Sequence, residues 1–113
     1  MGGAGFTNKM QQIPERDWKY MRSIQSELLE TLCSRINSEA SRIATDSTLS
    51  EHERFLALSS HMRAGKEIVA DCFDSWTRSN IGIKMLMLQR HALLTGEHVS
   101  RLSPETQNWL KAV

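Results

Sequence analysis

The chain has 113 residues and a formal net charge of +1, with 40% hydrophobic and 24% charged residues, the balance of an ordinary globular domain. This length indicates one domain, and the near-zero charge gives no whole-chain basis for binding nucleic acid or an anionic membrane surface. No apolar run reaches the roughly 18–20 residues that a membrane-spanning helix needs, and no secretory pattern opens the sequence, so we expect a cytoplasmic protein.

Residues 1–12 are rich in glycine and lack hydrophobic periodicity. They are predicted to be a disordered tail that precedes a single helical domain at residues 13–113. Gly2 after Met1 suggests a myristoylation signal. Position 6 is Phe6, where that signal needs serine or threonine, so we exclude it.

A first helix of about 31 residues is predicted from Pro14 to about Thr45. Proline suits the first helical turn, and Glu15 and Asp17 suit the positive end of the helix dipole. Neither proline nor glycine interrupts the remainder. Its apolar face consists of Trp18, Met21, Ile24, Leu28, Leu32, Ile36, Ala40 and Ile43.

A polar turn at residues 46–48 separates this helix from a second one, predicted from Ser50 to Asn80 and also about 31 residues long. Ser50 and Glu53 fit a capping box, and Thr48 with Glu51 fits the same pattern two residues earlier, so the sequence leaves two starts open. Two helices of matched length joined by a short turn indicate an antiparallel hairpin. The apolar stripe of the second helix, which we expect to be core as far as Trp76, consists of Phe55, Leu58, Met62, Gly65, Val69, Cys72 and Trp76.

A third, shorter helix of about 14 residues is predicted between Asn80, which can cap it, and a glycine C-cap at Gly96. Gly82 either breaks the preceding helix or only weakens it. Apolar residues lie on nearly all sides of this segment, which indicates burial inside the monomer or at an interface. The interaction face that we expect consists of Ile83, Met85, Leu86, Met87 and Leu88.

The end of the chain is predicted to hold a short helical turn at residues 97–102 and a last helix that begins with Ser103 as cap and Pro104 in the first turn. Trp109, Leu110 and Val113 are expected to dock this end on the bundle. The predicted fold class is therefore all-α, a helical bundle of two long antiparallel helices, a shorter third helix and a short helical C-terminal end.

The histidines do not match a metal-binding pattern. His52 lacks a second histidine four residues on, His61 falls on another face of the same helix, and His91 and His98 straddle Gly96. The sequence also has no Cys-x-x-Cys pair. We expect no metal and no cofactor, with solvated or capping histidines.

Three acids could form a catalytic or metal-binding row on the second helix, namely Glu67, Asp71 and Asp74. Arg63 and Arg78 lie four residues beyond the two ends of the row, where they can form helical ion pairs. Because the Glu-x-x-His ligands of a di-metal bundle are missing, we favour a solvated face and a protein that is not an enzyme.

Cys33 and Cys72 occupy apolar helix positions. Buried free thiols are the expectation for both, in preference to a disulfide or a nucleophile.

The section from residue 95 to residue 113 has the outline of a helix-turn-helix. Pro104 would begin its second helix, Lys111 would be the only basic residue of that helix, and Lys84, Arg90 and Arg101 are too scattered to form a phosphate track. Nucleic-acid binding is therefore not expected. The residues that would face DNA are Glu105, Thr106, Gln107 and Asn108.

Short motifs of the sequence resemble those of small all-helical bacterial proteins that carry no established activity. The motifs are Glu15-Arg16-Asp17-Trp18-Lys19, residues 52–58, Phe73-Asp74 with Arg78-Ser79, and Ser103-Pro104-Glu105-Thr106. The resemblance covers roughly residues 13–107. It implies a compact helical fold and a cytosolic setting, and no functional residue.

The sequence favours a non-enzymatic helical protein that self-associates or binds another protein, because the helices offer more apolar surface than three of them can hide. A homodimer formed through the hairpin and the segment Ile83–Leu88 is the expected assembly, and its competitor is a monomer whose C-terminal end, through Trp109 and Leu110, folds back over the same surface. The two alternatives are a small DNA-binding regulator that uses the C-terminal section and a metal-binding or enzymatic bundle that uses Glu67, Asp71 and Asp74.

Overall fold

The computed structural model describes residues 13–113, and the predicted tail at residues 1–12 lies outside the described residues. All regular structure in the described part is helical. The helices are α2 (Glu15–Ala44), α3 (Glu51–Phe73), α4 (Ile81–Arg90), α5 (Gly96–Ser100) and α6 (Pro104–Ala112). The predicted all-α class is confirmed, with two long packed helices, a shorter third helix and a short helical end.

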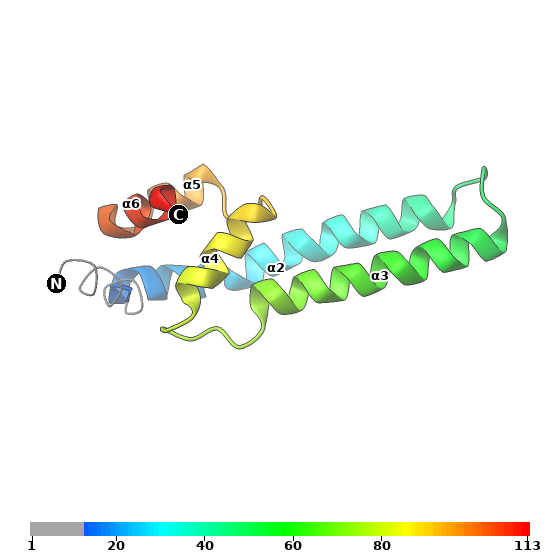
Figure 1. The fold of residues 1–113 in the computed structure, drawn as a ribbon. Coiled ribbons are helices and arrows are strands. Elements are labelled where there is room, and N and C mark those ends of the chain that lie inside the picture. Colours follow the sequence, from blue (N-terminus) through cyan, green and yellow to red (C-terminus); the bar gives the residue numbers. More distant parts are fainter. Residues whose placement is uncertain (1–12) are drawn as a thin grey trace.

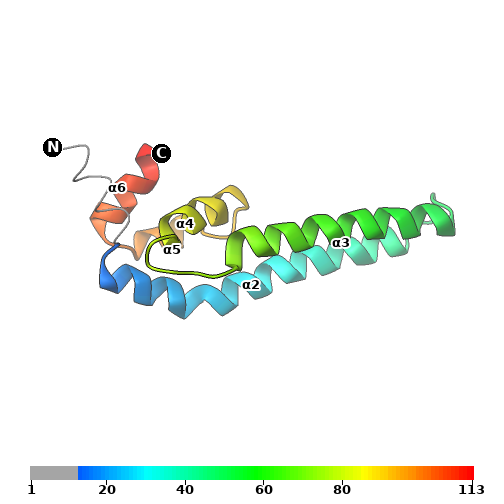
Figure 2. The same cartoon turned by 60° about the horizontal axis from the view of Figure 1, so that its bottom comes forward.

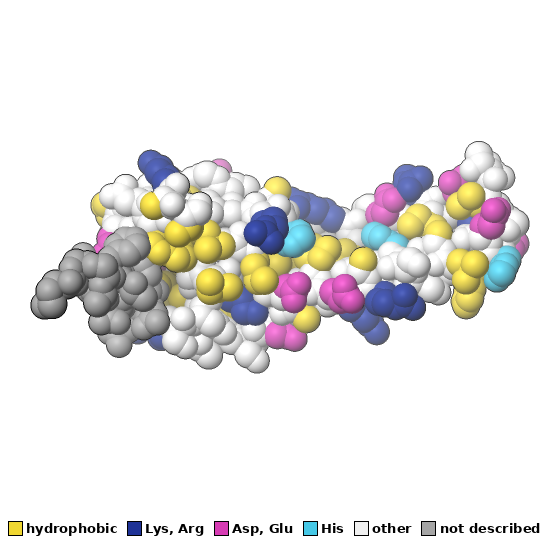
Figure 3. All heavy atoms as spheres, in the orientation of Figure 1, with side chains coloured by type: hydrophobic (Ala, Val, Ile, Leu, Met, Phe, Trp, Pro, Cys, Tyr) yellow, Lys and Arg dark blue, Asp and Glu magenta, His cyan; other side chains and the backbone are white. Residues whose placement is uncertain are grey.

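The molecule is elongated. Helices α2 and α3 lie side by side as a hairpin, while α4, α5 and α6 gather over the N-terminal half of α2 (Figures 1 and 2). The principal extents are 60 × 24 × 22 Å and the radius of gyration is 17.7 Å, against about 13 Å for a compact domain of this size. We call residues 33–69 the arm and the remaining described residues the head. The arm is the narrow part of the molecule in Figure 3.

The core lies almost entirely in the head. Within the arm only Ile43 and Gly65 are buried. In the head, α2 contributes a stripe at steps of three and four residues, on which α4 and the C-terminal segments pack. The buried apolar residues of the head are Ile13, Met21, Ile24, Leu28, Leu32, Cys72, Phe73, Ile81, Met85, Leu88, Leu93, Leu94, Leu102 and Leu110.

Helix α3 begins as predicted and ends earlier. The Ser50 hydroxyl accepts a hydrogen bond from the Glu53 N–H at 3.1 Å and the Glu53 carboxylate accepts one from the Ser50 N–H at 2.8 Å, which confirms the capping box. The helix has 23 residues and stops at Phe73, so the prediction that it continues to Asn80 is wrong.

Polar side chains replace the helical hydrogen bonds beyond Phe73. Ser75 takes a positive φ of 53°, outside the helical region. The side chain of Asn80 accepts a hydrogen bond from the Thr77 N–H at 2.9 Å and donates one to the Ser75 carbonyl at 2.8 Å. Such local side-chain bonds compete with helix propagation, so residues 74–80 form a loop.

Trp76 therefore lies in a loop and is half-buried, so its predicted place in the core as a continuation of the helix stripe is corrected. Its ring stacks on Phe73 with a centroid separation of 5.9 Å and an interplanar angle of 12°. Its indole N–H donates to the Cys72 carbonyl at 2.7 Å, which satisfies its one polar atom.

Helix α4 has 10 residues, fewer than predicted, and Gly82 is buried within it and breaks no helix. The chain turns after α4 at Ala92, with a φ of 55°, and not at a glycine. The predicted glycine C-cap is wrong, because Gly96 is the first residue of α5 and Thr95 is its N-cap. Arg35 of α2 closes α4 by donating to the carbonyls of His91 at 2.9 Å and Ala92 at 3.0 Å.

Helix α6 confirms the expected start, with Ser103 as N-cap and Pro104 in the first turn. Leu110 is buried and Trp109 is half-buried against the core, whereas Val113 is 66% exposed and does not dock. The C-terminal end thus covers the start of α2 and leaves the arm uncovered (Figure 2).

Candidate functional site

The arm is held together by a close approach of its two helices. A Cβ atom at Gly65 would lie 3.1 Å from both Cδ1 and Cγ2 of Ile36, so the absence of a side chain allows the contact. Nε2 of His61 lies 2.9 Å from the Ile36 carbonyl oxygen, and Arg54 donates to the Ala44 carbonyl at 3.3 Å. These contacts fix which residues of α2 and α3 share a level along the arm.

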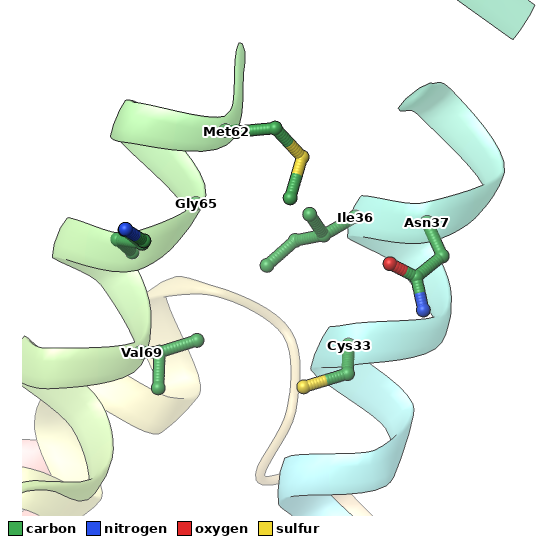
Figure 4. Close-up of a pocket in the computed structure, with 7 residues that line it drawn as sticks. Cys33, Ile36, Asn37, Met62, Gly65 and Val69 are labelled. Carbon is green, nitrogen blue, oxygen red and sulfur yellow. The ribbon is translucent and has the colours of Figure 1, made fainter. Parts of the chain in front are cut away.

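An apolar hollow of about 210 Å³ opens beside this contact (Figure 4). On α3, Gly65 lies between Met62 and Val69 along the wall of the hollow. Among the residues that the structure describes, Lys66 is the only charged one that lines it. The described residues of its lining are Cys33, Ile36, Asn37, Met62, Gly65, Lys66 and Val69.

Exposed apolar side chains continue from the hollow toward the tip of the arm. Phe55, Met62 and Val69 follow each other at steps of seven residues, nearly two helical turns, and so lie on one flank of α3. Phe55 is 64% and Met62 is 40% exposed. The hollow shows that Cys33 and Asn37 of α2 lie on the same side, and Ala40 follows Cys33 by seven residues. We call these six residues the open face.

The opposite flank of the hairpin carries the contacts with the head. Arg35 reaches the C-terminal end of α4, as described above, and Lys84 of α4 donates to the Asp71 carbonyl of α3 at 2.7 Å. No residue of α4, α5 or α6 lines the hollow. Val69, at the base of the hollow, packs partly against the core of the head, whereas in the described part of the chain the head does not cover the hollow itself.

A second, polar hollow of about 470 Å³ lies along α2. Serine hydroxyls dominate its lining, and Cys33 and Asn37 border both hollows. Its lining consists of Glu30, Cys33, Ser34, Asn37, Ser38 and Ser41. It forms a hydrophilic margin beside the open face.

The predicted acid row does not form one site. Glu67, Asp71 and Asp74 are all exposed, and Asp74 lies beyond the end of α3. Arg78 does not pair with Asp74 along a helix, because α3 has ended; it pairs with Glu15 at 2.6 Å. Among the described residues no group of three or more potential ligands could hold a metal ion.

The histidines occupy separate places. His52 is exposed, and His61 contacts α2 as described. The backbone carbonyl of His91 accepts a hydrogen bond from Arg35. His98 caps α5: its Nδ1 lies 3.1 Å from the Thr95 nitrogen, and its Nε2 lies 3.3 Å from Glu27. The expected solvated or capping roles thus fit exposed His52 and the cap His98, whereas His61 instead links α3 to the backbone of α2.

Both cysteines are free thiols, as predicted. Cys72 is fully buried, and burial raises the pKa of its thiol. Cys33 is only half-buried and lines the hollow, so the expectation of full burial holds for one of the two.

The C-terminal residues that would face DNA in a helix-turn-helix point partly inward. Thr106 is fully buried, and the Gln107 side chain donates to the Leu102 carbonyl at 2.8 Å. Helix α5 has only five residues. The side chain of Thr106 thus contacts α2 inside the head and is not available to DNA.

One buried polar cluster was missed by the sequence reasoning. Asp17 is expected from the sequence only to interact with the positive end of the helix dipole, but it is fully buried. Its carboxylate accepts hydrogen bonds from the Ser103 N–H at 2.8 Å, the Ser103 hydroxyl at 2.7 Å and the Thr106 hydroxyl at 2.6 Å. The signal that could have revealed it is its place four residues before Met21 on the buried stripe. The cluster ties the start of α2 to the N-terminus of α6.

The expected interaction face at Ile83–Leu88 lies mostly inside the monomer. Met85 and Leu88 are fully buried and present no surface to a partner, and Leu86 and Met87 are half-buried against the core. Only Ile83, at 56%, is strongly exposed.

Comparison of the chain with protein-family models, with curated proteins and with solved structures finds no match. The fold is that of a small all-helical protein, and the resemblance to bacterial helical proteins stays a prediction. Among the described helices, none is long and apolar enough to cross a membrane.

Proposed function

We propose that this protein is a non-enzymatic helical protein that self-associates through the open face of its arm. The observation that carries the proposal is an unfilled apolar hollow, lined in part by exposed Met62 and lying on the same flank of α3 as exposed Phe55, which no residue of α4, α5 or α6 lines. Exposed contiguous apolar surface on a protein marks an interaction site more often than chance. Two helices alone bury side chains only along the line where they touch. Packing against the two helices of a second arm would enclose a core between four helices.

The size of the open face suits a modest dimer. Phe55 to Val69 spans about 22 Å at 1.5 Å per residue, and two packed helices are about 20 Å wide. This gives about 400–600 Å² on each copy, or about 1,000 Å² in total. That area is at the lower edge of specific interfaces, so we expect micromolar affinity.

The charge of the face favours an identical copy over a charged partner. Within residues 13–113, Lys66 is the only charged residue around the hollow, so a second copy brings little like-charge repulsion there. A two-fold axis lets the same surface serve both subunits. In contrast to the assembly expected from sequence, the segment Ile83–Leu88 takes no part, because most of it is already buried.

Sedimentation velocity on a concentration series tests the proposal. Phe55→Glu places a carboxylate in the open face and should weaken the dimer at least tenfold. Leu56→Glu is the matched control, because Leu56 is also exposed, at 51%, and nine residues from Gly65 put it on the side of α3 away from α2. Equal effects of the two substitutions would show that the open face is not the interface.

The cytoplasmic setting and the relationship to bacterial helical proteins are part of this proposal. Support for the setting comes from the two free thiols, since reduced cysteines are typical of that compartment. No specific observation favours the DNA-binding or catalytic alternatives.

A further inference from the structure

Resting on the proposed self-association, we infer that the two arms dock antiparallel, with Phe55 of each copy entering the hollow of the other. The α3 residues that border the hollow, Met62, Gly65, Lys66 and Val69, are spaced i, i+3, i+4 and i+7. Four residues at this spacing form the hole that receives one side chain of a facing helix in coiled-coil packing. The hollow is therefore shaped to receive a side chain from another helix.

The occupant that fits is an aromatic ring. Cavities of about 150 Å³ lined by apolar side chains hold benzene, and this hollow measures about 210 Å³. Phe55 is the most exposed large hydrophobic side chain of α3, at 64%, and lies on the same flank as the hollow. It cannot reach the hollow of its own chain, because ten residues, about 15 Å, separate it from Gly65. A second copy supplies the ring where the first cannot.

Reciprocal insertion fixes the orientation of the two copies. If each Phe55 enters the other hollow, the two-fold axis crosses α3 midway between Phe55 and Gly65, near Ser60. On α2 the same level falls near Ala40, four residues beyond Ile36, which contacts Gly65. The two-fold axis is then perpendicular to the arms. Helix α2 packs on α2 of the other chain and α3 on α3 of the other chain, so the two heads lie at opposite ends of the dimer. The small side chain of Ala40 allows the two α2 helices to approach at the axis.

Cysteine trapping tests this arrangement, because Cys33 already lines the hollow. In Phe55→Cys the thiol at position 55 should form a disulfide with Cys33 of the other chain under mild oxidation by diamide. Within one chain these positions are about 20 Å apart along the arm, beyond the roughly 7 Å between Cα atoms that a disulfide allows. An intermolecular link at these positions therefore reports the neighbouring copy.

A second variant keeps Phe55 in place. Met62 lies within a turn of the inferred axis, so Met62→Cys should link to position 62 of the other chain. Leu56→Cys, on the far side of α3, is the control and should give at least tenfold less covalent dimer than either. Replacing Cys33 by serine in the Phe55→Cys variant should abolish the 55–33 link.

Peptide mapping by mass spectrometry separates the outcomes, together with sedimentation of the wild-type chain and of the reduced variants. Links 55–33 and 62–62 support the antiparallel arrangement. If the wild-type chain dimerises but the cysteine variants give neither link, or if position 55 links to position 55 of the other chain, the antiparallel arrangement is overturned while self-association stands. A wild-type chain that stays monomeric at every concentration would overturn both.

Discussion

Replacing Asp17 by alanine should destabilise the head more than any other substitution of an acidic residue in α2. The carboxylate accepts three hydrogen bonds of 2.6–2.8 Å from Ser103 and Thr106 in a fully buried site. Its removal leaves three donors without their acceptor. Each hydrogen bond to a charged group contributes about 1.5–3 kcal/mol, and the three are not additive because they share one carboxylate.

We expect Asp17→Ala to lower the free energy of unfolding by about 3–5 kcal/mol, because a buried donor that loses its acceptor costs about 1–3 kcal/mol and three neutral donors share this one. That is a large part of the 5–15 kcal/mol typical of a domain. Asp17→Asn keeps the shape and one accepting oxygen, so it should cost less, about 1–3 kcal/mol.

Urea unfolding followed by circular dichroism measures these losses. Glu15→Ala is the matched control, because Glu15 lies in the same first turn, and its ion pair with Arg78 is on the surface. It should cost no more than about 1 kcal/mol. A loss below about 1 kcal/mol for Asp17→Ala would refute the view that this cluster holds α6 to α2.

Three further outcomes follow from the fold. Ala92→Gly should raise the free energy of unfolding by about 0.5–1 kcal/mol in urea melts, because the positive φ strains alanine more than the added freedom of glycine costs; a loss would contradict the left-handed turn. Trp76→Ala should cost about 2–3 kcal/mol, below the 3–5 kcal/mol of a fully buried aromatic, and an unchanged urea midpoint would show that stacking on Phe73 adds nothing. Cys33 should react with a thiol reagent at least tenfold faster than Cys72 in dilute protein, since burial raises the pKa of the Cys72 thiol and blocks access; equal rates would place Cys72 at the surface.

The long first helix could be predicted because its signals agree. Proline and acids begin it, no glycine or proline interrupts it, and one apolar stripe runs its length. The end of α3 could not be predicted, because the spacing of the apolar stripe continues by coincidence to Trp76. The bonds made by Asn80 and the turn at Ser75 depend on a local conformation that periodicity does not report. Gly96 likewise had the composition of a C-cap, while Ala92 took the left-handed position.

The candidate site was less accessible from sequence. Gly65 stood out on the apolar stripe, but its contact with Ile36, and so the hollow, depends on the register between two helices. The sequence predicts an interface made by the hairpin together with Ile83–Leu88, and most of that segment is instead core, because hydrophobicity alone does not tell an interface from a core. Asp17 was missed because an acid in a first helical turn already has a sufficient explanation in the helix dipole.

Sedimentation of the wild-type chain at micromolar to submillimolar concentration tests the central claim most directly. Self-association through the arm predicts a reversible rise from the monomer mass of 12.9 kDa to about twice that value, with the rise lost in Phe55→Glu and kept in Leu56→Glu. A single species near 12.9 kDa across the whole range would contradict it.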